Sequence, residues 1–110
     1  MTYRIRFQSF GKSQILEVMA KPPCIIGRSL ASDIILWDMS VSRRHARLTE
    51  RDGKLHIEDL HATNGVLVNG IPVQCAALTP ADIVLLGNCV VQLAPLDAAI
   101  DARECALVES

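Results

Sequence analysis

Polar side chains between residues 27 and 70 carry the chemistry that this sequence offers. Arg28 presents a planar fork of N–H donors that suits a phosphate group. Ser42 and Thr63 provide hydroxyls, and the Asn64 amide can both donate and accept hydrogen bonds with a peptide backbone. Each of these residues lies beside a turn or at the end of a strand-like run. The segment therefore predicts loops that bind an anion and a peptide backbone.

Each of these residues also has an ordinary structural interpretation. Arg28 alone would be a solvated surface arginine, but an arginine directly after a glycine at a strand end can bring its fork and nearby backbone amides to one anion. Ser42 could instead cap its loop, and Arg43 with Arg44 could be a solvated pair. We prefer the binding interpretation for Arg28 and Ser42, and both interpretations stay open for Arg43.

The sequence gives little support for catalysis. A hydrolase triad built on Ser42, His45 and one of several aspartates is the arrangement that the residue types allow. The nucleophile and the base would then stand three residues apart on one loop and strand, with neither a nucleophile elbow nor an oxyanion loop. We therefore predict a protein that is not an enzyme and that needs no cofactor.

The cysteines and the single tryptophan are interpreted as packing residues. The cysteines are Cys24, Cys75, Cys89 and Cys105, and their spacing does not fit a metal site. Three of them lie in or beside apolar runs, which predicts buried, reduced thiols, although the spacing leaves a disulfide open. Trp37 is expected to pack in the core or in a loop, with no role in a binding site.

Length and charge limit the class of protein. The chain has 110 residues, half of them hydrophobic, which suits one compact domain. A formal net charge of −1 argues against broad binding to nucleic acid or to an anionic membrane. Residues 1–10 alternate in polarity and contain no run long enough for a signal peptide or a membrane span. We expect a cytoplasmic protein with neither nucleic-acid nor membrane partners.

Short apolar or alternating runs, separated by turn residues, predict an all-β sandwich of two packed antiparallel sheets. The expected strands are 3–7, 15–19, 24–26, 34–36, 44–49, 55–58, 66–68, 83–86 and 90–93. Asp52-Gly53 predicts a tight type I′ hairpin, and Asn64-Gly65 and Asn69-Gly70 have the same turn chemistry. Gly87-Asn88 predicts the last hairpin.

We assign residues 1–96 to the sandwich domain and residues 97–110 to a C-terminal tail. Asp97 can cap a short helix through residues 98–108, with Ile100 and Leu107 seven residues apart on one face. The alternative is the start of a linker.

The ordered set Gly27-Arg28, Ser42-x-x-His45 and Thr63-Asn64-Gly65 resembles the forkhead-associated (FHA) domain, a phosphothreonine-peptide-binding module. The resemblance covers about residues 3–95, and the whole set is specific where a single motif would not be. It implies an FHA-like β-sandwich of about eleven strands whose binding loops cluster at one end.

The resemblance also implies roles for individual residues. Arg28 and Ser42 would bind the phosphate with Arg43 as a second cation, Thr63 would line the phosphothreonine site, and Asn64 would bind the peptide main chain. The residues expected to shape the loops are Gly27, His45, Gly65, Asn69 and Gly70. Ala62 departs from the family pattern, in which a serine often stands at this position, so one loop-stabilising hydrogen bond is in doubt.

The sequence thus predicts a phosphopeptide-binding module that recognises phosphothreonine in partner proteins of a Ser/Thr kinase pathway. Binding without chemistry is the expected mechanism, because a phosphate adds about −1.5 to −2 charges that the loops can pair. The alternative is a phospho-independent interaction or assembly scaffold that uses the same sandwich.

Overall fold

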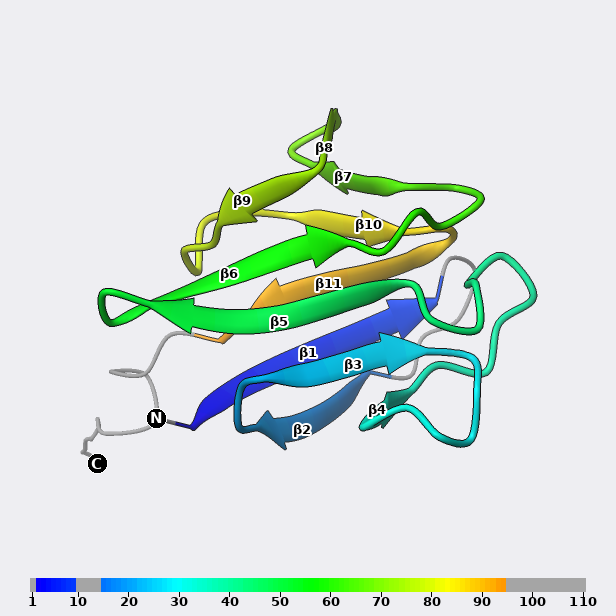
Figure 1. Cartoon of the computed structure of the whole chain (residues 1–110), viewed down its shortest axis with the longest axis horizontal. Helices are drawn as coiled ribbons and strands as arrows, with labels where there is room; N and C mark the ends of the chain where they lie inside the picture. Colours follow the sequence, from blue (N-terminus) through cyan, green and yellow to red (C-terminus); the bar gives the residue numbers. More distant parts are fainter. Residues whose placement is uncertain (1, 10–14, 95–110) are drawn as a thin grey trace.

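The computed structural model describes residues 2–9 and 15–94, which form strands and loops (Figure 1). The strands are β1 (Tyr3–Ser9), β2 (Leu16–Ala20), β3 (Cys24–Gly27), β4 (Ile34–Ile35), β5 (Ala46–Arg51), β6 (Lys54–Asp59), β7 (Val66–Val68), β8 (Ile71–Val73), β9 (Cys75–Ala77), β10 (Val84–Leu86) and β11 (Cys89–Leu93). They form a six-stranded sheet of order β2-β1-β11-β10-β7-β8 and a five-stranded sheet of order β4-β3-β5-β6-β9. The expected β-sandwich of eleven strands is confirmed.

Two strands, β8 and β9, were not among the runs picked out from the sequence pattern. Each has three residues and lies at the edge of a sheet, and β8 contains Pro72, which lacks a backbone N–H. One pair of strands also departs from the antiparallel expectation. β3 and β4 run parallel, with Ile26 opposite Ile34 and Gly27 opposite Ile35, because the loop between them returns the chain to the same direction.

The turn predictions hold at Asp52-Gly53 and fail at Asn64-Gly65. Asp52 and Gly53 both have positive φ, 54° and 74°, as a type I′ hairpin requires, and they join β5 to β6. At the other position Gly65 has a positive φ of 67°, whereas Asn64 does not, and the left-handed residue before it is His61. This segment crosses from one sheet to the other, so it is a longer loop and not a hairpin.

The core lies between the two sheets and is built from alternate residues of their strands. On β1, for example, Tyr3, Ile5 and Phe7 point inward and are buried. Full burial of one such aliphatic or aromatic side chain is worth about 1.5–3 kcal/mol. The Tyr3 hydroxyl also donates a 2.5 Å hydrogen bond to Glu50 of β5, which links the two sheets.

The cysteines divide into buried and exposed thiols. Cys24 and Cys89 are buried, as expected, but Cys75 is exposed, because it lies on the edge strand β9. Burial, together with the nearby Asp33 carboxylate, raises the pKa of the Cys24 thiol to about 11. Cys105 and the predicted helix through 98–108 fall outside the described residues.

The expectation that Trp37 packs in the core or a loop is wrong. Leu36 is buried, but Trp37 follows the end of β4 in a tight turn that the Asp38 N–H closes on the Leu36 carbonyl at 3.0 Å, and its side chain is 71% exposed. The described residues contain no helix that could cross a membrane.

Thiol labelling should distinguish these cysteines. In the folded protein at pH 8, N-ethylmaleimide should modify Cys75 well before Cys24 or Cys89, because only the thiolate reacts and the latter two are enclosed. Mass mapping of peptides after short labelling pulses measures the order, and a denatured sample shows that every site is labelled once exposed. Early modification of Cys24 under native conditions would contradict the packing described here.

Candidate anion-binding site

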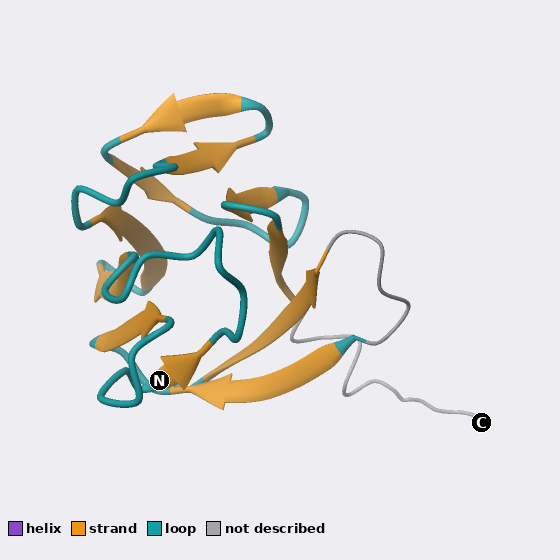
Figure 2. Ribbon diagram, turned by 90° about the vertical axis from the view of Figure 1, so that its right-hand side faces the viewer, coloured by secondary structure: helices purple, strands orange, loops and turns teal. Residues whose placement is uncertain are grey.

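The polar residues singled out in the sequence lie on loops at one end of the sandwich, which faces the viewer in Figure 2. The loops are 28–33 between β3 and β4, 36–45 between β4 and β5, 60–65 between β6 and β7, and 87–88 between β10 and β11. Strand register brings them together, with Ile26 opposite Ala46, Ala46 opposite Asp59, and Leu86 opposite Val66. Loops on such a scaffold are where binding groups are expected.

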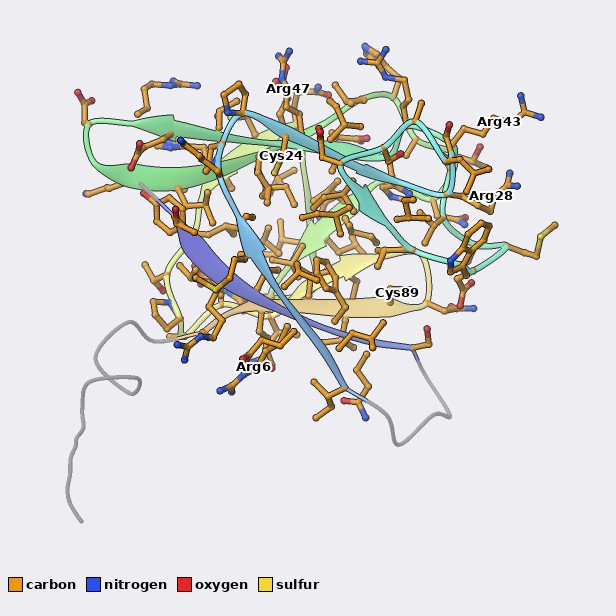
Figure 3. All side chains as sticks on the ribbon, turned by 90° about the horizontal axis from the view of Figure 1, so that it is seen from below. Arg6, Cys24, Arg28, Arg43, Arg47 and Cys89 are labelled. Atoms are coloured by element: carbon orange, nitrogen blue, oxygen red, sulfur yellow. The ribbon has the colours of Figure 1, made fainter. Side chains whose placement is uncertain are left out.

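Arg28 is held at its base and open at its tip. Its backbone N–H donates to the Ser42 carbonyl at 3.0 Å, and its Nε donates to the Val41 carbonyl at 3.0 Å. The terminal nitrogens have no partner among the described residues. The side chains of Arg28 and Arg43 lie on the same side of this end of the molecule (Figure 3). The guanidinium of Arg28 is therefore oriented in advance for an anion.

The charge of these arginines is not balanced by acidic neighbours. In residues 2–9 and 15–94 no carboxylate forms an ion pair with Arg28, Arg43 or Arg44. Arg6 and Arg47, on the sheet faces, are paired with glutamates instead. In the part of the chain that the structure describes, these three arginines thus leave positive charge unpaired at the loops.

Ser42 contributes a hydroxyl whose proton is still available. Its Oγ accepts a hydrogen bond from the backbone N–H of Thr63 at 3.0 Å, which joins two loops. A hydroxyl has one O–H donor besides its two acceptor lone pairs, so Ser42 can still donate to an anion. Thr63 itself is exposed beside it.

Asn64 is exposed, and one N–H of its side-chain amide is held by a hydrogen bond within the protein. Its Nδ2 donates to the backbone carbonyl of Ser40 at 2.8 Å. The Oδ1 atom and the second N–H stay available as acceptor and donor, which is the pair of groups that a peptide backbone needs.

His45 lies beneath these loops and is completely buried. Its Nδ1 accepts the backbone N–H of Ser42 at 3.0 Å, so the proton must be on Nε2, which donates to the Gly65 carbonyl at 2.7 Å. One imidazole therefore connects the Ser42 loop to the Asn64-Gly65 loop.

Gly27 allows the backbone of Arg43 to pass close by. A Cβ at residue 27 would lie 2.0 Å from the Arg43 carbonyl oxygen, so no other residue fits without moving the chain. The same carbonyl accepts hydrogen bonds from the Ser29 N–H at 3.2 Å and from the Ser32 hydroxyl at 3.3 Å.

The sequence interpretation missed a junction centred on Ser40. Its hydroxyl donates to Asp38 Oδ1 at 2.6 Å and accepts the backbone N–H of Asn88 at 2.7 Å. Gly87 packs against it so closely that a Cβ there would lie 2.4 Å from the Ser40 carbonyl oxygen. Asp38-x-Ser40 is a recognisable turn signal, but nothing in the sequence says that the β10–β11 hairpin meets this loop.

Two of the expected loop-shaping residues lie away from the site. Asn69 and Gly70 join β7 to β8 at the end of β7 opposite Gly65, where Asn69 bonds to Asp82 and to the backbone of Ile83. At the family departure, the Ala62 N–H donates to Asp59 Oδ1 at 3.0 Å, so this loop is held without a serine.

The fold and these loops define a β-sandwich that presents unpaired hydrogen-bond donors at one end. The chain belongs to the FHA domain family, whose model matches residues 24–87. That range contains every loop described above except the last residue of the β10–β11 turn, Asn88.

Similar proteins include a curated relative and two solved structures. Glycogen accumulation regulator GarA of Mycolicibacterium smegmatis is 39% identical over 71 residues, which cover 64% of this chain and 45% of that protein. The FHA domain of CT664 protein from Chlamydia trachomatis is 30% identical with a TM-score of 0.72, covering 84% of this chain and 97% of that one. A structure from a study of phosphothreonine-dependent FHA domain interactions is 29% identical with a TM-score of 0.69, covering 84% and 96%. The chain spans half or less of the length of the first curated relatives that it matches.

Replacing Gly27 by alanine should displace the Ser42 loop. We expect a loss of about 1–3 kcal/mol in the free energy of unfolding, because the added methyl overpacks against the Arg43 carbonyl. Gly53→Ala is the control: its Cβ meets nothing within 4 Å but its φ is +74°, so strain alone should cost about 1–2 kcal/mol.

Urea unfolding measures both losses, and backbone amide NMR shifts locate the disturbance. Gly27→Ala should move the signals of residues 28–45, whereas Gly53→Ala should affect only its hairpin. Unchanged loop signals in Gly27→Ala would show that the close approach does not position the loop.

Proposed function

We propose that this chain is a phosphothreonine-peptide-binding module without catalytic activity. The observation that carries the proposal is the Arg28 guanidinium, which is held by the Val41 carbonyl and has no ion-pair partner among the described residues. Its loop is hydrogen-bonded to the neighbouring loop, which carries the available Ser42 hydroxyl. A phosphate offers these groups about −1.5 to −2 charges and three acceptor oxygens. Family membership and the similar structure with phosphothreonine-dependent interactions support the same ligand.

Each loop residue has a separate task in this proposal. Arg28 and the Ser42 hydroxyl bind the phosphate, with Arg43 as a second cation and Thr63 lining the site. Asn64 binds the peptide main chain through the amide groups that Ser40 leaves available. The residues that hold the loops without touching the ligand are Gly27, His45 and Gly65.

The geometry of His45 supports binding without chemistry. A catalytic base would have to accept a proton from the Ser42 hydroxyl. The Nδ1 atom instead accepts the backbone N–H of Ser42, and Nε2 donates to the Gly65 carbonyl. Both ring nitrogens of the buried imidazole are thus used in holding loops.

Changing Arg28 tests the phosphate site. Arg28→Ala should raise the Kd for a phosphothreonine peptide at least tenfold while the fold survives, because a charge-assisted contact is worth roughly 1.5–3 kcal/mol. Arg28→Lys should also bind poorly, since an ammonium group cannot replace the planar fork. Titration calorimetry measures the Kd values.

Arg47→Ala is the matched control, because it removes an arginine that is already paired with Glu58 on a sheet face. It should bind like the wild type. The dephosphorylated peptide completes the test: equal affinity with and without phosphate would favour the phospho-independent scaffold, and wild-type affinity in Arg28→Ala would remove Arg28 from the site.

A phosphothreonine peptide should bind better than its phosphoserine twin, although both carry the same charge. The difference is one methyl group, whose burial is worth about 0.8 kcal/mol, or roughly fourfold in Kd. The branched β-carbon also restricts χ1 and lowers the cost of ordering the bound side chain. Paired titrations at one salt concentration decide the matter, and equal Kd values would mean that these loops bind the anion without reading the threonine.

A further inference from the structure

The outer faces of the two sheets differ in character. Arg6 of the six-stranded sheet and Arg47 of the five-stranded sheet point away from these opposite faces (Figure 3). On the five-stranded sheet, Arg47 lies opposite Glu58 and forms an ion pair with it. On the six-stranded sheet, two middle strands are apolar throughout, with Val84-Leu85-Leu86 in β10 and Val66-Leu67-Val68 in β7. A sheet with one face in water normally alternates apolar and polar residues, so this face has the composition of a covered surface.

The apolar side chains of this face form one row across the sheet. Direct strand pairing joins, in order, Val90 of β11, Leu85 of β10, Leu67 of β7 and Pro72 of β8. We call these four residues the Leu85 row. The residues on either side of Leu85 are buried in the core, so the row points away from it. Single apolar residues on a surface are ordinary, whereas a contiguous set marks an interaction surface.

The two ends of the row differ in shape. A hollow of about 80 Å³ lies at the β1 end, and its lining includes Gln8, which is opposite Val90, and the exposed Ile15. Pro72 is exposed at the other end, on the edge strand β8. Strands lie about 4.8 Å apart, so Gln8 and Pro72 are each two strands, or roughly 10 Å, from Leu85.

We propose that the Leu85 row is a self-association surface, through which two copies of this chain pack their six-stranded sheets face to face. A two-fold axis along β10 brings Leu85 against the same residue of the other copy. The operation also places Val90 over Leu67 of the other copy, and the hollow at Gln8 over its Pro72, because the members of each pair are equally far from Leu85. Packed sheets of this kind lie about 10 Å apart with their strands roughly 30° from parallel.

Charge favours a second copy over other occupants. The row contains no ionisable side chain, and an uncharged apolar surface is complementary to itself, as a two-fold interface requires. The cores of interfaces are also depleted of charged residues. The arginines of β1 beside the row, Arg4 and Arg6, are both engaged by Glu17, at 3.6 and 2.9 Å. The face therefore suits neither nucleic acid nor an anionic lipid surface, which are bound by cations that have no such partner.

The size of the face sets the strength of the contact. Six strands of about five residues cover roughly 24 Å by 17 Å, or about 400 Å² in projection. A standard stable interface buries about 800 Å² of accessible surface on each partner. Interfaces of that standard size begin at micromolar affinity, so the smaller contact predicts a dimer with a Kd above about 1 µM.

This dimer leaves the proposed binding loops accessible. Loops 28–33 and 36–45, which carry Arg28 and Ser42, connect strands of the five-stranded sheet, and the row lies on the outer side of the other sheet. Two copies can therefore each bind a ligand. A partner with two phosphothreonine segments would gain affinity from the second, intramolecular binding event. The self-association itself does not depend on the proposed function.

Sedimentation velocity of the whole chain, over a concentration series up to about 1 mM, tests the proposal without any ligand. The wild type should pass from monomer to dimer. Leu85→Lys should raise the dimer Kd at least tenfold, because the two-fold axis places two ammonium groups against each other. Thr49→Lys is the matched control, since Thr49 is a partly exposed strand residue on the other sheet, and it should dimerise like the wild type. Urea unfolding checks that each variant is folded.

A double variant tests the pairing of Val90 with Leu67 of the other copy. Val90→Lys and Leu67→Glu should each weaken the dimer when made alone, because each leaves a charge without a partner in an apolar contact. Together they should restore part of the affinity, because each new cation then faces a new anion of the other copy. If Leu85→Lys does not fold, these variants provide the same test.

The outcomes are separate from those of the phosphopeptide experiments. A wild type that stays monomeric at about 1 mM would overturn the proposal and leave the row to a different partner. Dimerisation that survives Leu85→Lys, or that is lost equally in Thr49→Lys, would also overturn it, and so would a double variant no better than the single ones. Leu85→Lys should bind a phosphopeptide with a single phosphothreonine like the wild type. If no phosphopeptide binds, the proposed function fails and the self-association result stands.

Discussion

The binding end of this sandwich depends on one buried imidazole. His45 connects the Ser42 backbone to the Gly65 carbonyl, so two loops that belong to different connections between strands are held at a fixed separation. A buried polar group is costly unless it is fully hydrogen-bonded, and here both ring nitrogens are satisfied. Because the loops are fixed in advance, a ligand does not have to order them, which lowers the cost of binding.

The loops can bind a ligand only through the donors and acceptors that are not used in hydrogen bonds within the protein. Arg28 donates one hydrogen bond to the Val41 carbonyl, and Asn64 donates one to the Ser40 carbonyl. The Ser42 hydroxyl accepts one from the Thr63 N–H. Each side chain is thereby oriented by one structural hydrogen bond and keeps other groups for a ligand. In the proposed binding mode, the fold and the ligand use different atoms of the same residues, so the side chains are held rigid and still have groups to bind with.

The sequence predicted what depends on local pattern and on an ordered set of motifs. Alternation located most strands, and Asp52-Gly53 specified its hairpin because two positive φ values favour those residues. The sequence pattern gave wrong predictions where the exposure or conformation of a residue depends on its place in the fold. The edge position of β9 exposes Cys75, the crossing between sheets turns Asn64-Gly65 into a loop, and the end of β4 leaves Trp37 in solvent. Ser40 was missed for the same reason, since its partners are 24 and 48 residues away.

The junction between Ser40 and the β10–β11 hairpin has a consequence for folding. β11 pairs with β1 through contacts such as Ile5 with Leu93, so the hairpin is placed only when the two ends of the domain have come together. Contacts between distant parts of a chain form slowly, because the loop must close before they can stabilise it. The Asn64 amide is hydrogen-bonded to Ser40, and Ser40 is hydrogen-bonded to the β10–β11 hairpin. The loops therefore reach this arrangement only after β11 has packed onto the sheet. A ligand that binds it would stabilise the whole sandwich and not only its loops.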